Sequence, residues 1–229
     1  MDVAAQQLEM WQDGQAVDRM PVVVGKPSQP TPSLAGLVRF LVLRPYWHMP
    51  PDLAAARIAP AVLREGTGAL ERQDLEAVTD FTSNAQLLDP GSVDWTAVAA
   101  GREIVYLRQR PGPQNMMGLV KFIFPNTLGV YLHDTPLRDL FSTARRTESA
   151  GCVRVSDAPR LANWLMNGEV DLDAAGEPET IVDLPQAVPV FTPYLTARAI
   201  DGAVERRADI YRRDPPLLAA LAKAARSTA

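Results

Sequence analysis

The stretch from Tyr131 to Val155 holds the residues whose types and spacing could do chemistry. It contains the only cysteine of the chain, Cys152, and one of its two histidines, His133. Cys152 follows Gly151 and precedes Arg154 by two positions. A thiolate is a strong nucleophile, and a neighbouring histidine or arginine favours it by lowering the thiol pKa. We therefore predict that acyl transfer occurs on Cys152.

The base that activates this thiol has two candidates, His133 and His48. His133 ends an apolar run, which would fix its ring, whereas His48 lies in a proline-rich loop. We predict His133 as the general base, which would then return the proton to the leaving amine as a general acid.

Five neighbours are predicted to bind the substrate or its oxyanion: Tyr131, Asp134, Ser149, Gly151 and Arg154. Gly151 lets a carbonyl approach closely and leaves N–H groups of the turn for an oxyanion hole. Tyr131 is two residues from His133, so the two side chains share one face of a strand. Arg154 shares a strand face with Cys152 for the same reason.

Each of these residues also has an interpretation without chemistry. Cysteine is among the most buried residue types, so Cys152 fits a packed thiol, and a lone histidine in a strand fits a structural role. Tyr131 suits simple packing, and Arg154 suits a solvated face with the other nearby arginines. Residue spacing by itself leaves these interpretations open.

The elements that position this stretch are predicted to be short strands joined by turns. Asp13-Gly14 predicts a hairpin between strands at 3–12 and 15–24. In the strand at 118–125, the residues that alternate between its two faces are mainly apolar on either face, so we expect both faces to be buried. Other strands are predicted at 36–43, 102–109, 128–133, from Cys152 onward, and around the turn Asp201-Gly202.

Helices are predicted mostly between about 50 and 100, where Asp52 and Pro60 suit helix starts and 67–78 suits short helical turns. A helical insertion near a site is a candidate lid. Another helix is predicted at about 158–167, capped by Ser156 or Asp157. The last helix is expected to turn its apolar side inward: Leu217, Leu218, Leu221 and Ala224.

The composition is that of a folded, mildly acidic domain. The 229 residues suit one or two domains, and 47% of them are hydrophobic. The formal net charge of −4 argues against nucleic acid as the main partner. No apolar run approaches the length of a membrane span, and a single cysteine with two histidines gives no disulfide and no metal-ligand spacing. No signal peptide is recognisable and we expect the chain to start in mid-domain, as a fragment whose targeting segment, if any, lies upstream.

These residues resemble the signature of the L,D-transpeptidase catalytic domain, in the larger Gram-negative branch with an inserted lid. The motif is Tyr-Leu-His-Asp-Thr-Pro at 131–136, followed by Ser-Ala-Gly-Cys-Val-Arg-Val at 149–155. Ala150 stands where smaller members have histidine, and His48 where we expect asparagine, so a catalytic role for His48 is disfavoured. Further segments match in the family's order over about 1–214: 24–27, 45–47, 50–51, 109–115, 118–122, 124–126 and 209–211.

The resemblance implies a YkuD-type fold: mixed and predominantly β, a sandwich or barrel-like domain with an inserted, mostly helical lid. It implies a catalytic domain of 1–49 and 109–214, a lid of 50–108 and a C-terminal helix of 215–229. It also implies Cys152 as nucleophile and His133 as base, with a backbone carbonyl near Asp134 orienting the imidazole.

The implied activity is peptidoglycan L,D-transpeptidation in the periplasm or cell envelope. Cys152 would take the acyl group of a tetrapeptide stem, release D-alanine, and pass the acyl group to the amine of a second stem as a 3→3 cross-link. No cofactor or metal is implied, and carbapenem-type β-lactams are expected to acylate Cys152. Two alternatives remain: an L,D-carboxypeptidase or D-amino-acid exchange enzyme at the same site, and a non-catalytic wall-binding module.

Overall fold

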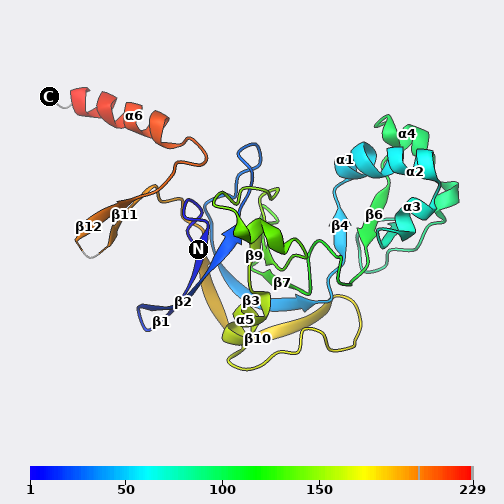
Figure 1. Cartoon of the computed structure of the whole chain (residues 1–229), viewed down its shortest axis with the longest axis horizontal. Coiled ribbons are helices and arrows are strands. Elements are labelled where there is room, and N and C mark those ends of the chain that lie inside the picture. Colours follow the sequence, from blue (N-terminus) through cyan, green and yellow to red (C-terminus); the bar gives the residue numbers. More distant parts are fainter. Residues whose placement is uncertain (201, 228–229) are drawn as a thin grey trace.

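The computed structural model describes residues 1–200 and 202–227, and within them one seven-stranded sheet forms the main body. Neighbouring strands pair antiparallel, except for the parallel pair β8 and β9 (Figure 1). The strand order across the sheet is β1 (Gln7–Gln12), β2 (Gln15–Val23), β9 (Val153–Val155), β8 (Leu132–His133), β7 (Val120–Ile123), β3 (Ala35–Leu43) and β10 (Thr180–Phe191).

The main core lies on one face of this sheet, where α5 (Ala158–Met166) packs. Asp157 caps α5 by accepting a hydrogen bond from the Arg160 N–H, and Leu161 and Leu165 of the helix are buried. Alternate residues of the central strands join them in this core, including Leu41, Phe122 and Leu132. The side chains that alternate with them therefore face the other way.

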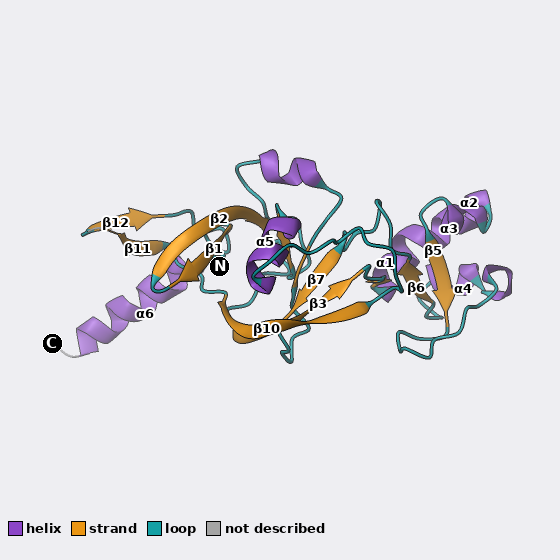
Figure 2. Cartoon of the chain, turned by 90° about the horizontal axis from the view of Figure 1, so that it is seen from below, coloured by secondary structure: helices purple, strands orange, loops and turns teal. Residues whose placement is uncertain are grey.

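Residues 46–109, called the arm below, form a second unit at one end of the body (Figures 1 and 2). Its three-stranded sheet, counted over the described residues, is β4 (Trp47–Met49), β6 (Tyr106–Gln109) and β5 (Leu75–Val78). A separate core runs from Met49 to Leu107. The arm helices are α1 (Pro51–Leu53), the π-helical turn η1 (Ala54–Ile58), α2 (Ala59–Glu65), α3 (Gly68–Glu71), the 3-10 turn η2 (Pro90–Ser92) and α4 (Trp95–Ala99).

The other end of the body carries the hairpin of β11 (Ala197–Ile200) and β12 (Ala203–Arg206), followed by α6 (Asp214–Ser227). Both elements project away from the sheet in Figures 1 and 2. Leu217, Leu218 and Leu221 are 57%, 63% and 58% exposed. The prediction of an inward apolar face on this helix is therefore wrong, because these three leucines are mostly exposed in the described part of the chain.

The fold class is confirmed: the protein is mainly β, with a few helices. The first hairpin, the strand at 36–43 and the helix after Asp157 lie close to their predicted positions. The helical turns predicted through 67–78 are wrong at their end, because β5 pairs with β6 there. The turn predicted at Asp201-Gly202 falls partly on Asp201, which lies outside the described residues.

Candidate active site

The parallel pairing of β8 and β9 places four candidate side chains on one face of the sheet. Leu132 pairs with Val153, and both of these side chains lie in the main core. Side chains alternate along a strand, so the flanking residues face the opposite side. That side, called the catalytic face below, carries Tyr131, His133, Cys152 and Arg154. His133 is thereby the strand partner of Arg154, 21 positions further along the chain.

His133 is held as a neutral imidazole of one tautomer. Its side chain is 2% exposed, and Nδ1 lies 2.5 Å from the carbonyl oxygen of Asp134. A carbonyl only accepts, so Nδ1 carries the hydrogen and Nε2 keeps its lone pair. Burial, and then the charge of Arg154, lower the pKa of His133 to about 3. The base candidate is therefore uncharged at neutral pH and oriented through a backbone carbonyl, the geometry that the resemblance implied.

Cys152 is half-buried next to Tyr131. Its thiol donates to the carbonyl of Gly129 at 3.9 Å, and the Tyr131 hydroxyl donates to the Met117 sulfur at 3.6 Å. Among the described residues, no hydrogen bond joins this sulfur to His133. Burial raises the pKa of the Cys152 thiol, while hydrogen bonds from Tyr131 and the charge of Arg154 lower it. Arg154 thus lowers the pKa of the thiol, as the sequence predicted, but burial raises this pKa by more.

The turn before Cys152 is fixed by hydrogen bonds within the protein. The Ser149 hydroxyl donates to the Cys152 carbonyl at 2.5 Å and accepts the Gly151 N–H at 3.2 Å. Gly151 has φ +115°, which favours glycine, and its carbonyl accepts from the Thr31 hydroxyl at 2.8 Å. Ser149 and the Gly151 N–H are therefore engaged in shaping the turn, which favours a positioning role over the predicted substrate contact.

Asp134 is likewise engaged inside the protein. Its carboxylate accepts from the Leu119 N–H at 3.0 Å and pairs with Arg138 at 2.7 Å. The side chain is 1% exposed and lies against Gly118, where any Cβ would overlap the carboxylate. Only the backbone carbonyl of Asp134 reaches the site, through His133. The predicted substrate contact of its side chain has no support in this geometry.

Arg154 retains an unused donor. Its Nη1 donates to the Glu148 carbonyl at 3.4 Å, but its buried Nε makes no hydrogen bond among the described residues. An unpaired buried donor costs about 1–3 kcal/mol, more when it is charged. This N–H could therefore bind an oxygen of a substrate, in agreement with the prediction for Arg154.

Lys121 belongs to the same face, and the sequence interpretation missed it. It is the strand partner of His133 across β7 and β8, and its side chain is 12% exposed. The ammonium lies 3.2 Å from Glu179 and 5.9 Å from the Tyr131 ring centroid. The lone charge in an apolar strand was the available signal. The predicted double burial of this strand is wrong, because Lys121 and Ile123 are only half-buried.

Thr31 and Tyr211 form a second group that the sequence interpretation did not place. Thr31 joins the Gly25 N–H to the Gly151 carbonyl, at 2.9 and 2.8 Å. The Tyr211 hydroxyl donates to the Gly25 carbonyl at 2.8 Å and accepts from the Thr31 N–H at 3.2 Å. These bonds tie three distant segments around the Cys152 turn, and no local pattern signals them.

His48 lies in the arm, away from the thiol. Its ring stacks on Phe81 at 4.5 Å between centroids, and burial lowers its pKa. In the described part of the chain, no group of three metal-ligating side chains occurs, and no helix is long and apolar enough to cross a membrane.

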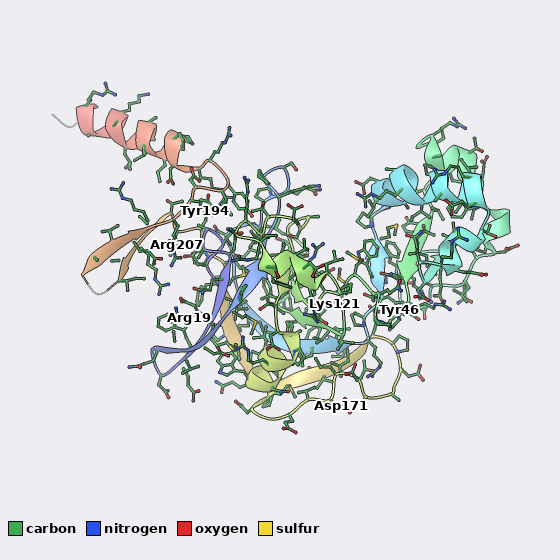
Figure 3. All side chains as sticks on the ribbon, in the orientation of Figure 1. Arg19, Tyr46, Lys121, Asp171, Tyr194 and Arg207 are labelled. Carbon is green, nitrogen blue, oxygen red and sulfur yellow. The ribbon has the colours of Figure 1, made fainter. Side chains whose placement is uncertain are left out.

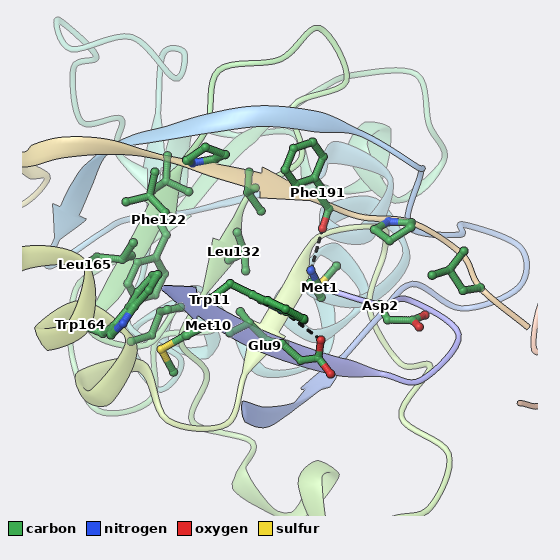
Figure 4. Close-up of a pocket in the computed structure, with 18 of the residues that line it drawn as sticks. Met1, Asp2, Glu9, Met10, Trp11, Phe122, Leu132, Trp164, Leu165 and Phe191 are labelled. Atoms are coloured by element: carbon green, nitrogen blue, oxygen red, sulfur yellow. Dashed lines mark hydrogen bonds between the residues drawn. The ribbon is translucent and has the colours of Figure 1, made fainter. Parts of the chain in front are cut away.

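An apolar cavity of about 580 Å³ lies on the core side of the sheet, away from the catalytic face. Phe122 and Leu132 line it, and they point away from Lys121 and His133 along the same strands (Figure 4). Dashed lines in Figure 4 mark two hydrogen bonds in this cavity. The Met1 amino group donates to the Phe191 carbonyl, and the Trp11 indole donates to Glu9. Neither Cys152 nor His133 lines this cavity, so the candidate nucleophile and base lie outside it.

Comparison with known proteins identifies a family for this chain. The sequence model of the YkuD family, described as the L,D-transpeptidase catalytic domain, matches residues 1–182. The chain belongs to this family. We therefore interpret Cys152 and His133 as residues of an L,D-transpeptidase domain.

Two relatives give the extent of the similarity. A Haemophilus influenzae protein named "Putative L,D-transpeptidase" is 27% identical over 220 residues, which cover 93% of this chain and 44% of that protein. The chain thus spans less than half of this relative. An L,D-transpeptidase structure from Mycobacterium smegmatis is 17% identical with a TM-score of 0.39, covering 84% of this chain and 56% of the other.

Proposed function

We propose that this L,D-transpeptidase domain forms 3→3 peptidoglycan cross-links through a thioester on Cys152. The main observation behind this proposal is that β8 and β9 present Cys152 and a neutral, oriented His133 on one face of the sheet. Family membership supports the peptidoglycan substrate. The periplasm or cell envelope as location, and acylation by carbapenem-type β-lactams, belong to the same proposal.

In the first step, Cys152 Sγ attacks the carbonyl of the third residue of a tetrapeptide stem, and its proton moves to Nε2 of His133. Because the pKa of the thiol is raised and that of His133 is lowered, this transfer accompanies bond formation to the carbonyl. The Cys152 amide N–H makes no hydrogen bond among the described residues, so it and Arg154 Nε are the proposed oxyanion donors. The C–N bond then breaks, and His133 returns the proton to the departing amine of D-alanine.

In the second step, the neutral amine of an acceptor stem attacks the thioester carbon. Its nitrogen loses a proton to His133 as the new C–N bond forms, and the C–S bond breaks to release the Cys152 thiolate. Water in place of the amine gives an L,D-carboxypeptidase, the second candidate, because the same thioester serves both reactions.

We also propose the domain assignment that the resemblance implied: a catalytic domain of 1–49 and 109–214, a lid of 50–108, and a C-terminal helix of 215–229. Residues 228 and 229 of the last segment lie outside the described residues. A cleft of about 590 Å³ supports the lid, because Phe81 and Arg108 line it from the lid while Lys121 lines it from the catalytic face.

Intact-protein mass spectrometry with meropenem tests the nucleophile. One adduct is expected on the wild type and none on Cys152→Ala; an adduct that survives the substitution would overturn the thioester mechanism. A purified tetrapeptide substrate then tests the reaction. Cross-linked dimers with released D-alanine are expected, and tripeptide as the sole product would replace the transpeptidase assignment by the carboxypeptidase.

A further inference from the structure

The cleft between the arm and the main sheet borders the proposed acyl-transfer site. Tyr46, His48 and Arg108 line it on the arm side, and Lys121 and Glu179 on the side of the main sheet. Figure 3 shows Lys121 and Tyr46 at this junction. Lys121 also pairs with His133 in the sheet, so whatever occupies the cleft lies next to the catalytic face.

The positive charge of the catalytic face is a problem for an amine substrate. Arg154 and Lys121 both belong to this face. An aliphatic amine is an ammonium ion near neutral pH, and like charges repel. An acceptor amine therefore needs a negative group in the cleft. The carboxylate of Asp134 cannot provide it, because it is buried and paired with Arg138. Two carboxylates line the cleft: Asp80, which lies on the arm side and accepts hydrogen bonds from the Thr82 N–H and hydroxyl, and Glu179, which lies on the side of the catalytic face.

Glu179 provides such a group. One carboxylate oxygen lies 3.2 Å from the Lys121 ammonium, and the other makes no hydrogen bond within residues 1–200 and 202–227. The side chain is 38% exposed and faces the cleft. Its negative charge favours a higher pKa for both the His48 imidazole and the Tyr131 hydroxyl, so it is within electrostatic reach of the arm and of the catalytic face.

The backbone of Glu179 also departs from the ordinary conformation. Its φ is +55°, a region that glutamate rarely adopts and that usually persists only where the surroundings enforce it. The N–H donates to the Arg44 carbonyl at 3.0 Å, directly before β10 begins at Thr180. The main sheet thus holds the carboxylate over Lys121 rather than leaving it on a free loop.

We propose that Glu179 binds the ammonium group of the acceptor amine and thereby favours amine over water as the second substrate; this inference rests on the proposed function. Glu179 recruits the acceptor beside the thioester. The ammonium first loses one proton to water in the open cleft, and the neutral nitrogen loses its second proton to His133 as the C–N bond forms and the C–S bond breaks. Glu179 is a specificity residue for this step.

A competition between a cationic and an uncharged nucleophile tests this role. The whole chain is supplied with tetrapeptide donor, Nα-acetyl-lysine as the ammonium acceptor, and hydroxylamine, which is uncharged at neutral pH. Both capture the same thioester, so the ratio of amide to hydroxamate cancels any change in the first step. Mass spectrometry of the products gives this ratio for the wild type, Glu179→Gln and the matched control Glu177→Gln. Glu177 is exposed and lies outside the cleft lining.

The amide-to-hydroxamate ratio is expected to fall roughly 10- to 100-fold in Glu179→Gln, the loss typical of one hydrogen bond to a charged group. Glu177→Gln should keep the wild-type ratio. An unchanged ratio in Glu179→Gln, or an equal fall in both variants, would overturn this inference while D-alanine release still supports the proposed function. Absence of D-alanine release from the wild type would overturn the proposed function and this inference with it.

Discussion

At the scale of single residues, burial limits the reactivity of both Cys152 and His133. Burial raises the pKa of the thiol and lowers that of the imidazole, so the resting pair is neutral. Tyr131 and Arg154 are the groups that stabilise the thiolate once it forms. The nucleophile is therefore restrained at rest, and we expect its reactivity to rise with pH.

Alkylation of Cys152 by iodoacetamide measures this restraint, because the chain has no other cysteine. The rate should climb through pH 7 to 9 as the thiolate fraction grows. Arg154→Met should slow alkylation several-fold at pH 7.5, since the pKa rises further without the cation, whereas Arg154→Lys should recover part of the rate. Arg102→Met, at an exposed arginine of the arm, is the control. A rate plateau below pH 7 would contradict this prediction.

Burial of His133 should also appear in the pH dependence of stability. Its folded pKa of about 3 lies below the usual value near 6.5, so the unfolded chain binds the proton first as pH falls. Stability should be full above about pH 6.5 and should fall between there and pH 3. From pH 6.5 to 5 the loss due to this group is about 1.5 kcal/mol.

Urea unfolding of the wild type and His133→Gln at both pH values isolates this contribution, because the remaining titratable groups are common to the two proteins. The wild type should lose about 1.5 kcal/mol more than the variant over this interval. Equal losses in both proteins would show that His133 is not buried in its neutral form.

At the scale of elements, the site depends on the loop that leads into β7 as well as on β8 and β9. Gly118 has φ +61° and packs against the Asp134 carboxylate, whose residue orients His133. The Asp134 N–H donates to the Val120 carbonyl at 3.0 Å, which fixes the peptide between loop and strand. The imidazole is thus positioned by backbone contacts from a neighbouring strand.

Gly118→Ala should lower the free energy of unfolding by more than the backbone strain of alanine at positive φ alone. Alanine at positive φ costs about 1–2 kcal/mol, and the clash with Asp134 should bring the loss of unfolding free energy to about 3 kcal/mol or more. Gly101→Ala is the matched control, because Gly101 has φ +68° and open space around it. Denaturant unfolding and D-alanine release report the two effects. Equal costs for both variants would mean that the Asp134 contact is unimportant.

At the scale of the whole molecule, the body and the arm each have a core. Leu41 and Leu107, both 0% exposed, belong to the main core and the arm core respectively. Two strands, β4 and β6, lead from the body into the arm and back. This arrangement suits a lid that moves or unfolds as one unit.

Leu107→Ala and Leu41→Ala, the same substitution in the two cores, should separate the units. Each should destabilise its own core by about 2–5 kcal/mol. Hydrogen exchange is expected to lose protection in β4, β5 and β6 for Leu107→Ala, while the main sheet keeps it, and the reverse for Leu41→Ala. A uniform loss of protection in both variants would identify a single cooperative unit.

The local patterns of the chain were sufficient for much of the fold. Asp13-Gly14 fixed the first hairpin, Asp157 fixed the start of α5, and the alternation in the strands placed Tyr131 with His133. Within the arm, the end of the helical turns predicted at 67–78 was wrong, because pairing of β5 with β6 overrides helical propensity there. The leucines of α6 were misjudged because an apolar stripe does not indicate what covers it.

The sequence by itself determined the family and the two groups that could form a thioester site, because residue types and local spacing carry that information. Only the tertiary structure decided that β8 and β9 run parallel, that Lys121 and Glu179 adjoin the site, and that Ser149 and Asp134 are engaged internally. The physical reason is that strand pairing, burial and charge proximity are set by contacts between distant parts of the chain. Those contacts fix the pKa values of Cys152 and His133, which no local pattern specifies.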